Sequence, residues 1–181
     1  MKLPPPQPPK SSLPRLTTDV LPPYRYIPGI NKHPVRDPEG HSYGREHATL
    51  AFLAPEKWRK NHEYLFGVDL YNAAYWWESH EAWENVWHTT DKQGPYGQFL
   101  QGLIQISAAF IKWYSHEEIG MRKLYELGIM RLEFVCDRHV NFMGLDLNSY
   151  LLKLKKHFAP VLAEAASWPD PRKDYPFIIL E

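Results

Sequence analysis

The chain has 181 residues, of which 44% are hydrophobic, and this length and composition fit one domain with a sizeable core. Its 21 lysines and arginines balance 21 aspartates and glutamates, so no net charge directs the protein to nucleic acid or to an anionic membrane. The single cysteine, Cys136, excludes an intramolecular disulfide, and no apolar run approaches the ~20 residues of a membrane span. We therefore expect a soluble, cytoplasmic protein without nucleic-acid or membrane partners.

The prolines divide the chain into an extended part and a body. Eleven of the 17 prolines lie in the first 38 residues. We predict a flexible arm over residues 1–20, because this segment has too few apolar side chains to fold alone. Residues 21–44 alternate prolines with tyrosines and aliphatic residues, which predicts an ordered, extended strap across the body. The strap contains His33 and His41. Residues 45–181 are predicted to form a single helical domain.

The body is predicted to be all-α, a compact bundle of about five helices. Pro55 suits the first turn of the first helix, because proline at that position loses no helical hydrogen bond. A second helical run covers about residues 70–88, with a break near residues 72–74. The third helix, over residues 96–114, is apolar almost all round and is therefore expected to be the most buried one.

Capping residues predict where the last two helices begin. Ser115 is expected to cap the fourth helix, and Asp146 or Asn148 the fifth, which should end at Pro160. The tail over residues 175–181 has the composition of a strand but no obvious partner. We expect it to pack as an extended segment.

Residues 78–87 read E-S-H-E-A-W-E-N-V-W and place an imidazole and three carboxylates on one predicted helix. His80 and Glu84 lie one turn apart on the same face, with Glu81 beside them. Large aromatic residues share this face, so the polar groups are expected in or beside an apolar seam. Ionisable groups there are costly unless they are paired, hydrogen-bonded or bound to a metal. Imidazole and carboxylates are ligands for zinc, iron or manganese.

Two glutamines interrupt the apolar third helix. Gln101 and Gln105 lie one turn apart, and amides inside such a helix must find partners. We expect them to hydrogen-bond with His80, Glu81 or Glu84, so that the polar stripes of the second and third helices meet. Gly102, between the glutamines, lets another backbone approach closely.

Two of these segments together resemble a known family. The run Y-N-A-A-Y-W-W-E-S-H-E-A-W-E over residues 71–84 and the run F-L-Q-G-L-I-Q over residues 99–105, followed by an Ala-Ala pair, resemble the domain of unknown function 309 family. The resemblance covers about residues 60–137. It implies a compact helical bundle and a label of predicted metal-dependent hydrolase. The chain departs from the family pattern, in which glycine, histidine and asparagine are common, at Ala74, Lys112 and Glu117.

Two hypotheses for function follow. The first is a metal-dependent hydrolase of an unknown small molecule, with a divalent ion between the second and third helices and the strap as a roof. The candidate metal ligands are His80, Glu84, His33 and His41, and the candidate catalytic residues are Glu81, Glu78, Gln101 and Gln105. The second is a non-catalytic structural or interaction module, in which the same residues form a buried hydrogen-bond network. Its aromatic surface would then bind a partner or a second copy of the chain, as a homo-oligomer.

Overall fold

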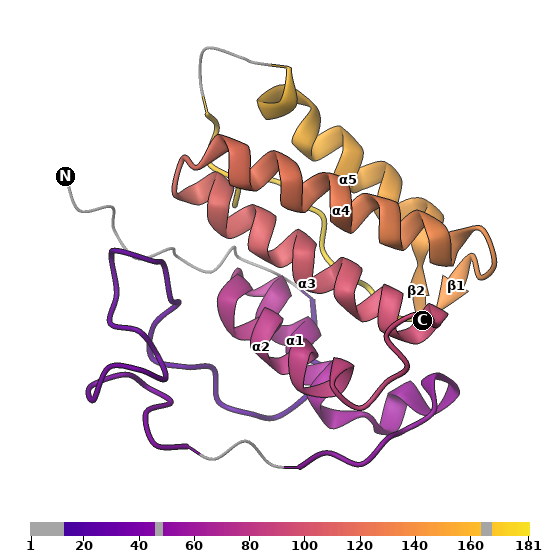
Figure 1. The fold of residues 1–181 in the computed structure, drawn as a ribbon, viewed down its shortest axis with the longest axis horizontal. Helices are drawn as coiled ribbons and strands as arrows, with labels where there is room; N and C mark the ends of the chain where they lie inside the picture. Colours follow the sequence, from indigo (N-terminus) through magenta and orange to yellow (C-terminus); the bar gives the residue numbers. More distant parts are fainter. Residues whose placement is uncertain (1–12, 46–48, 164–167) are drawn as a thin grey trace.

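The computed structural model describes residues 13–45, 49–163 and 168–181. Within these residues the chain forms five α-helices, one short 3-10 helix and a two-stranded hairpin (Figure 1). The elements are η1 (Pro55–Lys60), α1 (His62–Asn72), α2 (Trp76–Trp87), α3 (Pro95–Tyr114), α4 (Glu118–Cys136), β1 (Asn141–Phe142), β2 (Leu145–Asp146) and α5 (Leu147–Leu162). The predicted all-α bundle of about five helices is confirmed.

The central helix is α3, which runs between α4 and the pair formed by α1 and α2 (Figure 1). Most of its residues are buried, as its apolar sequence predicts. At Gly102 the α3 backbone approaches α4, since a Cβ atom at that position would lie 3.3 Å from the Gly128 carbonyl oxygen. The predicted close approach at Gly102 is therefore a contact between two helix backbones.

A sharp break separates α1 from α2, near the predicted position. Ala74 occupies the left-handed region with φ +60°, and the Tyr75 N–H donates to the Leu70 carbonyl oxygen at 2.8 Å. This conformation favours glycine, which is the residue that the resembling family commonly has at that position. The break turns α2 so that its first residues lie next to the strap.

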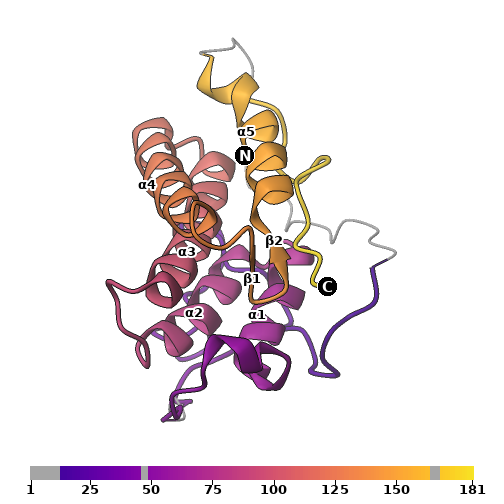
Figure 2. The same ribbon diagram turned by 90° about the vertical axis from the view of Figure 1, so that its right-hand side faces the viewer.

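The C-terminal tail finds two partners that the sequence does not reveal. The Asn72 side chain accepts from the Ile178 N–H at 2.8 Å and donates to the Ile178 carbonyl oxygen at 2.7 Å, like a neighbouring strand. Leu180 forms an isolated bridge with Leu145 of the hairpin. Figure 2 shows the tail running beside α5 to the hairpin. The tail is extended, as predicted, and it is held by the α1–α2 break and by β2.

Several predicted boundaries differ from the structure. Pro55 starts a short 3-10 helix, and α1 begins separately after Asn61, whose side chain accepts from the Tyr64 N–H at 3.0 Å. Ser115 is not the cap of α4, because α4 starts only at Glu118. Asp146 caps α5 as predicted, but α5 continues past Pro160 to Leu162.

Among the helices of the described residues, none combines the length and the apolar character that a membrane crossing requires.

Candidate functional site

Glu78, in the first turn of α2, joins the helix to the strap. Its Oε1 atom accepts from the backbone N–H of Tyr26 at 2.8 Å and lies 3.2 Å from Nε2 of His41. The side chains of Glu78 and His41 are each only 5% exposed. The second carboxylate oxygen, Oε2, is buried and has no hydrogen-bond partner among the described residues. Glu78 is thus the buried carboxylate of this region, and half of its hydrogen-bonding capacity is unused.

Both ring nitrogens of His41 have partners within the strap and α2. The Glu78 carboxylate can only accept, so Nε2 carries a hydrogen, while Nδ1 lies 2.9 Å from Oγ of the adjacent Ser42. His33 is also engaged locally, since its Nδ1 accepts from the Val35 N–H at 3.2 Å. The structure therefore does not bring either strap histidine to His80 and Glu84, with which they were expected to share a metal ion.

A buried arginine accompanies Glu78. Arg25 donates from Nε to the Ala73 carbonyl oxygen at 2.9 Å, and its guanidinium lies over the Tyr75 ring. Burial lowers the pKa of Arg25, and the negative charge of Glu78 acts in the opposite direction. The strap is thus fixed at the α1–α2 break by its own Arg25 and by the Glu78 carboxylate of α2.

The arm contributes a further contact. The backbone N–H groups of Leu16 and Thr17 donate to the carboxylate of Asp69 at 2.8 and 2.9 Å, and the Thr17 hydroxyl donates to it at 2.7 Å. Asp69 is buried on α1, and such a carboxylate is stable because several donors surround it. Residues 13–20 of the predicted flexible arm therefore have a defined anchor, whereas residues 1–12 lie outside the described residues.

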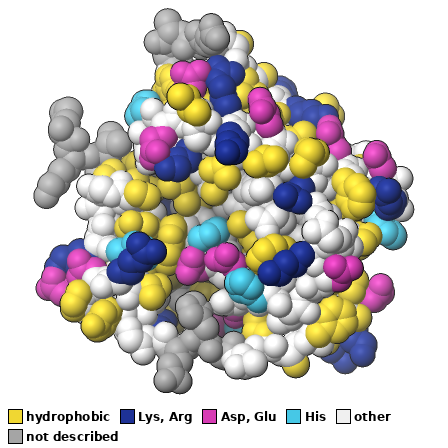
Figure 3. All heavy atoms as spheres, viewed as in Figure 1, with side chains coloured by type: hydrophobic (Ala, Val, Ile, Leu, Met, Phe, Trp, Pro, Cys, Tyr) yellow, Lys and Arg dark blue, Asp and Glu magenta, His cyan; other side chains and the backbone are white. Residues whose placement is uncertain are grey.

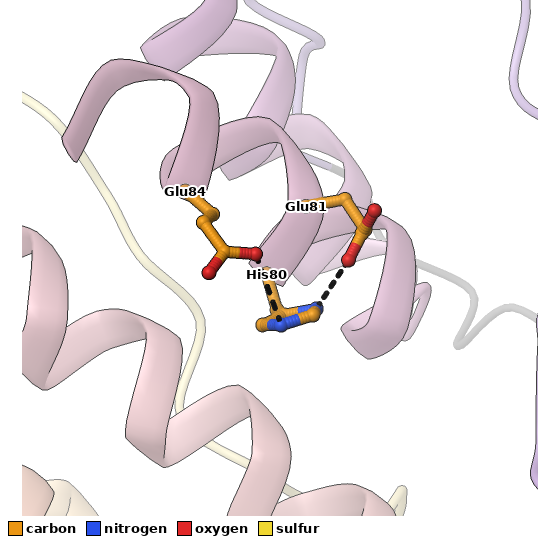
Figure 4. Close-up of side chains that lie close together, drawn as sticks. All are labelled: His80, Glu81 and Glu84. Carbon is orange, nitrogen blue, oxygen red and sulfur yellow. Dashed lines mark ion pairs between the residues drawn. The ribbon is translucent and has the colours of Figure 1, made fainter. Parts of the chain in front are cut away.

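One turn further along α2, His80, Glu81 and Glu84 form a cluster at the surface (Figure 4). Each offers one ligand atom, and these three atoms lie within 4.8 Å of one another. Nδ1 of His80 is 3.1 Å from the Trp77 carbonyl oxygen and 3.4 Å from Oε1 of Glu81, and Nε2 is 3.7 Å from Oε2 of Glu84. The side chains are 23%, 27% and 41% exposed.

These exposed fractions decide between the two predicted positions of the cluster. His80, Glu81 and Glu84 lie beside the apolar core and not within it, and they do not form one buried network; of the four ionisable residues, Glu78 is the buried one. The face shown in Figure 3 has acidic side chains and histidines gathered over α2. The cluster is therefore accessible to an ion or a substrate from solvent.

Gln105 and Gln98 of α3 face a different helix. Oε1 of the buried Gln105 accepts from Nε of Arg131 on α4 at 3.1 Å, and Oε1 of Gln98 accepts from Nη1 of the same arginine at 2.5 Å. Among the hydrogen bonds of the described residues, none joins Gln101 or Gln105 to His80, Glu81 or Glu84. The polar contact between α2 and α3 is made by Ser79 and Ser107, whose hydroxyl oxygens are 3.2 Å apart.

A pocket of about 480 Å³ lies between the N-terminal segment and the helices α1 and α2. His41 and Val35 of the strap, Glu63 and Phe66 of α1, and Trp77 and Glu78 of α2 contribute to its lining. Glu81 also lines this pocket, so this residue connects the pocket with the surface cluster. The sequence did not suggest a role for Glu63, because a single carboxylate in a first helical turn is an ordinary feature.

The comparisons with known proteins address this same region. Residues 64–124 match a family model described as Domain of unknown function (DUF309). The matched segment contains the α1–α2 break, all of α2 and α3, and therefore the cluster and the Glu78 side of the pocket. No curated protein matches the chain.

Proposed function

We propose that the protein, whose residues 64–124 match the DUF309 family model, is a metal-dependent hydrolase. A divalent cation would be held by His80, Glu81 and Glu84, at the edge of the pocket that Glu81 also lines. The substrate would be a small molecule that enters this pocket. The mixed imidazole and carboxylate donors suit zinc, manganese or iron.

The arrangement around His80 carries the proposal. The Trp77 carbonyl oxygen can only accept, so Nδ1 of His80 bears the hydrogen and, in the neutral ring, Nε2 presents its lone pair. This lone pair is 3.7 Å from Oε2 of Glu84, which is also an acceptor. Two acceptors that face each other are stabilised by a cation between them. A ligand histidine whose other nitrogen donates to a backbone carbonyl is also the usual arrangement around protein-bound metals.

A bound divalent ion would supply a polarised substrate bond and a water of lowered pKa. The chain's own contribution would be orientation. The Trp77 carbonyl holds the His80 ring, and Glu81 belongs to the cluster and lines the pocket, so its carboxylate oxygen that does not bind the ion can hold a proton taken from a nearby water. Gln105 is already engaged with Arg131, so we assign it to the α3–α4 contact and not to the substrate.

Glu78 and His41, which the sequence analysis included among the candidate residues of the metal site, have a structural role in this proposal. Their mutual contact and the hydrogen bond from Tyr26 hold the strap on α2. The second hypothesis, a structural network, therefore applies to this buried pair, and the hydrolase hypothesis applies to the surface cluster.

The test is metal analysis and thermal melting of the wild type and His80→Gln, each with and without a chelator. A metal ion whose free concentration is 100 times its Kd stabilises the folded state by about 2.7 kcal/mol. Removal of the ion by the chelator should therefore lower the wild-type Tm. His80→Gln should lose the metal and the response to the chelator. Because the cluster is half-exposed, the substitution should otherwise change the stability by only about 0.5 kcal/mol.

His88→Gln is the matched control, because His88 is exposed just after the end of α2. This variant should keep the metal content, the response to the chelator and the metal-dependent hydrolysis of model esters and phosphodiesters. A wild type that takes up no zinc, manganese or iron, and whose Tm is unchanged by the chelator, would defeat the proposal.

A further inference from the structure

The pocket between the N-terminal segment and the helices α1 and α2, called the strap pocket below, is lined mainly by acidic groups. Its lining contains four carboxylates, contributed by Asp19, Glu63, Glu78 and Glu81, against one arginine, Arg45, and His41. All four have described partners, since Asp19 pairs with His62, Glu63 accepts from Asn85, Glu78 contacts His41 and Glu81 contacts His80. None of these partners is a lysine or an arginine. The pocket of a chain with balanced total charge is therefore locally acidic.

Glu78 provides an independent indication of a ligand. It is 6% exposed and lines the pocket, and its Oε2 atom has no donor among the described residues. A buried carboxylate oxygen without a donor is unfavourable, and a charged N–H donor offsets this cost better than a neutral one. Arg25 does not line the pocket, and its guanidinium donates to Ala73 and lies over Tyr75.

The remaining walls are suited to an apolar body that carries a charge. Trp77 and Phe66 contribute aromatic surface, and Val35 and Ala82 contribute aliphatic surface. A cation over an aromatic ring is attracted by the ring's electron-rich face. The volume of about 480 Å³ is in the range of small-molecule sites.

We propose that the strap pocket binds a small organic cation, a primary amine or a guanidinium group on a short apolar body. The charged end donates to Oε2 of Glu78 and lies in the field of Glu63, and the apolar body packs against Trp77 and Phe66. Binding requires no metal ion at His80, Glu81 and Glu84. The pocket therefore has a ligand preference of its own, whether or not the surface cluster is a metal site.

The test uses full-length protein that has been treated with a chelator, with benzylamine and agmatine as probes. Titration calorimetry and thermal shift should show saturable binding of at least one of the two cations. Benzyl alcohol and benzoate, which match benzylamine in size but are neutral and anionic, should bind at least tenfold more weakly. A similar affinity for cation, alcohol and benzoate would overturn the proposal, as would the absence of cation binding at 10 mM, about the weakest affinity that such a contact should give.

Variants locate the binding. Glu63→Gln removes a charge from the wall without touching the strap and should weaken cation binding about tenfold, and a folded Glu78→Gln should weaken it at least as much. Glu126→Gln, on the exposed face of α4, and His80→Gln should leave the affinity unchanged. Unchanged binding in both pocket variants, or binding that appears only when metal is added, would overturn the proposal. Loss of metal binding by His80→Gln with intact cation binding separates this inference from the proposed hydrolase.

Discussion

Neighbouring residues on one face of α2 have very different surroundings. Glu78 and Glu81 are three residues apart, yet Glu78 is buried under the strap and Glu81 lies at the edge of the pocket. The difference arises because the hydrogen bonds from the strap, through Tyr26 and His41, go to Glu78 in the first turn of the helix. Helical spacing predicts which side chains point the same way, but the segment that covers them is distant in the sequence.

His157 on α5 is expected to make stability depend on pH. Burial lowers its pKa, although the hydrogen bond from Nε2 to the Pro171 carbonyl oxygen acts in the opposite direction. The folded pKa is then below the unfolded value, so the unfolded chain takes up the proton first as the pH falls. The stabilising contribution is complete above about pH 6.5 and is lost as the pH falls through the folded pKa.

We predict that His157→Gln flattens the decrease in Tm between pH 7.5 and pH 5 relative to the wild type. His139→Gln is the control, because His139 is exposed and should leave the slope unchanged. The slopes are compared, since the substitution can shift the Tm at every pH through lost packing against Trp113. Equal slopes in the wild type and His157→Gln would show that this histidine is not responsible.

Sequence reasoning identified the residues of the surface cluster but not the environment of each. The spacing of His80, Glu81 and Glu84 was sufficient to predict that they converge, because one helix turn fixes their separation. The partners of Gln105 and Glu78 come from α4 and from the strap, and nothing in the local sequence specifies them. The buried pair of Glu78 and His41 joins residues 37 positions apart.

At the scale of elements, apolar periodicity and turn residues were sufficient to predict the helices. The errors concern the residues at which the helices begin and end. The break between α1 and α2 was predictable because Asn72 and its neighbours interrupt the pattern. The 3-10 helix η1 and the hairpin were not, because segments this short contain too few residues to show a period. Capping by Asp146 was predictable, since the Asp side chain accepts locally from the Ser149 N–H.

The contact between α3 and α4 should be sensitive to a single methyl group at Gly102. A Cβ atom there would lie 2.8 Å from the side chain of Leu132, which is fully buried and cannot move aside freely. We expect Gly102→Ala to destabilise the protein by about 1–3 kcal/mol, because overpacking forces the helices apart. Denaturant unfolding measures the change.

Gly120→Ala, on α4, is the matched control. Its Cβ atom would meet only the flexible Lys112 side chain at 3.3 Å, and alanine favours a helix over glycine by up to about 1 kcal/mol. This variant should be neutral or more stable than the wild type. If both variants have the same stability, the close approach of the two helices is not a constraint on the fold.

At the scale of the whole molecule, the strap and the C-terminal tail both lie against the α1–α2 break. The tail reaches it through Ile178 and Asn72, and the strap reaches it through Arg25 and Ala73. Amino-acid composition distinguished these extended segments from the helical body, because the strap is rich in proline and the tail has the composition of a strand. Their docking positions depend on hydrogen bonds between individual side chains and backbone groups that are distant in the sequence, and composition does not encode those.

Docking of the strap should depend on Glu78. In Glu78→Ala the Tyr26 N–H and the His41 ring lose their buried acceptor, and leaving a buried donor unsatisfied costs about 1–3 kcal/mol. The strap should then open more often, and trypsin should cut more rapidly after Arg25, which is 3% exposed in the docked strap. Arg36 is exposed, so cleavage there does not report on docking.

The measurement is the rate of cleavage after Arg25, followed by mass spectrometry, in the wild type, Glu78→Ala and Glu84→Ala. Glu84 lies on the same helix but contacts His80 and not the strap, so its variant should be cut as slowly as the wild type. Melting curves show whether each variant is still folded at the temperature of the digestion. Faster cleavage after Arg25 in a Glu78→Ala protein that remains folded means that this carboxylate holds the strap. Rapid cleavage there in the native wild type, or equal rates in all three proteins, would mean that it does not.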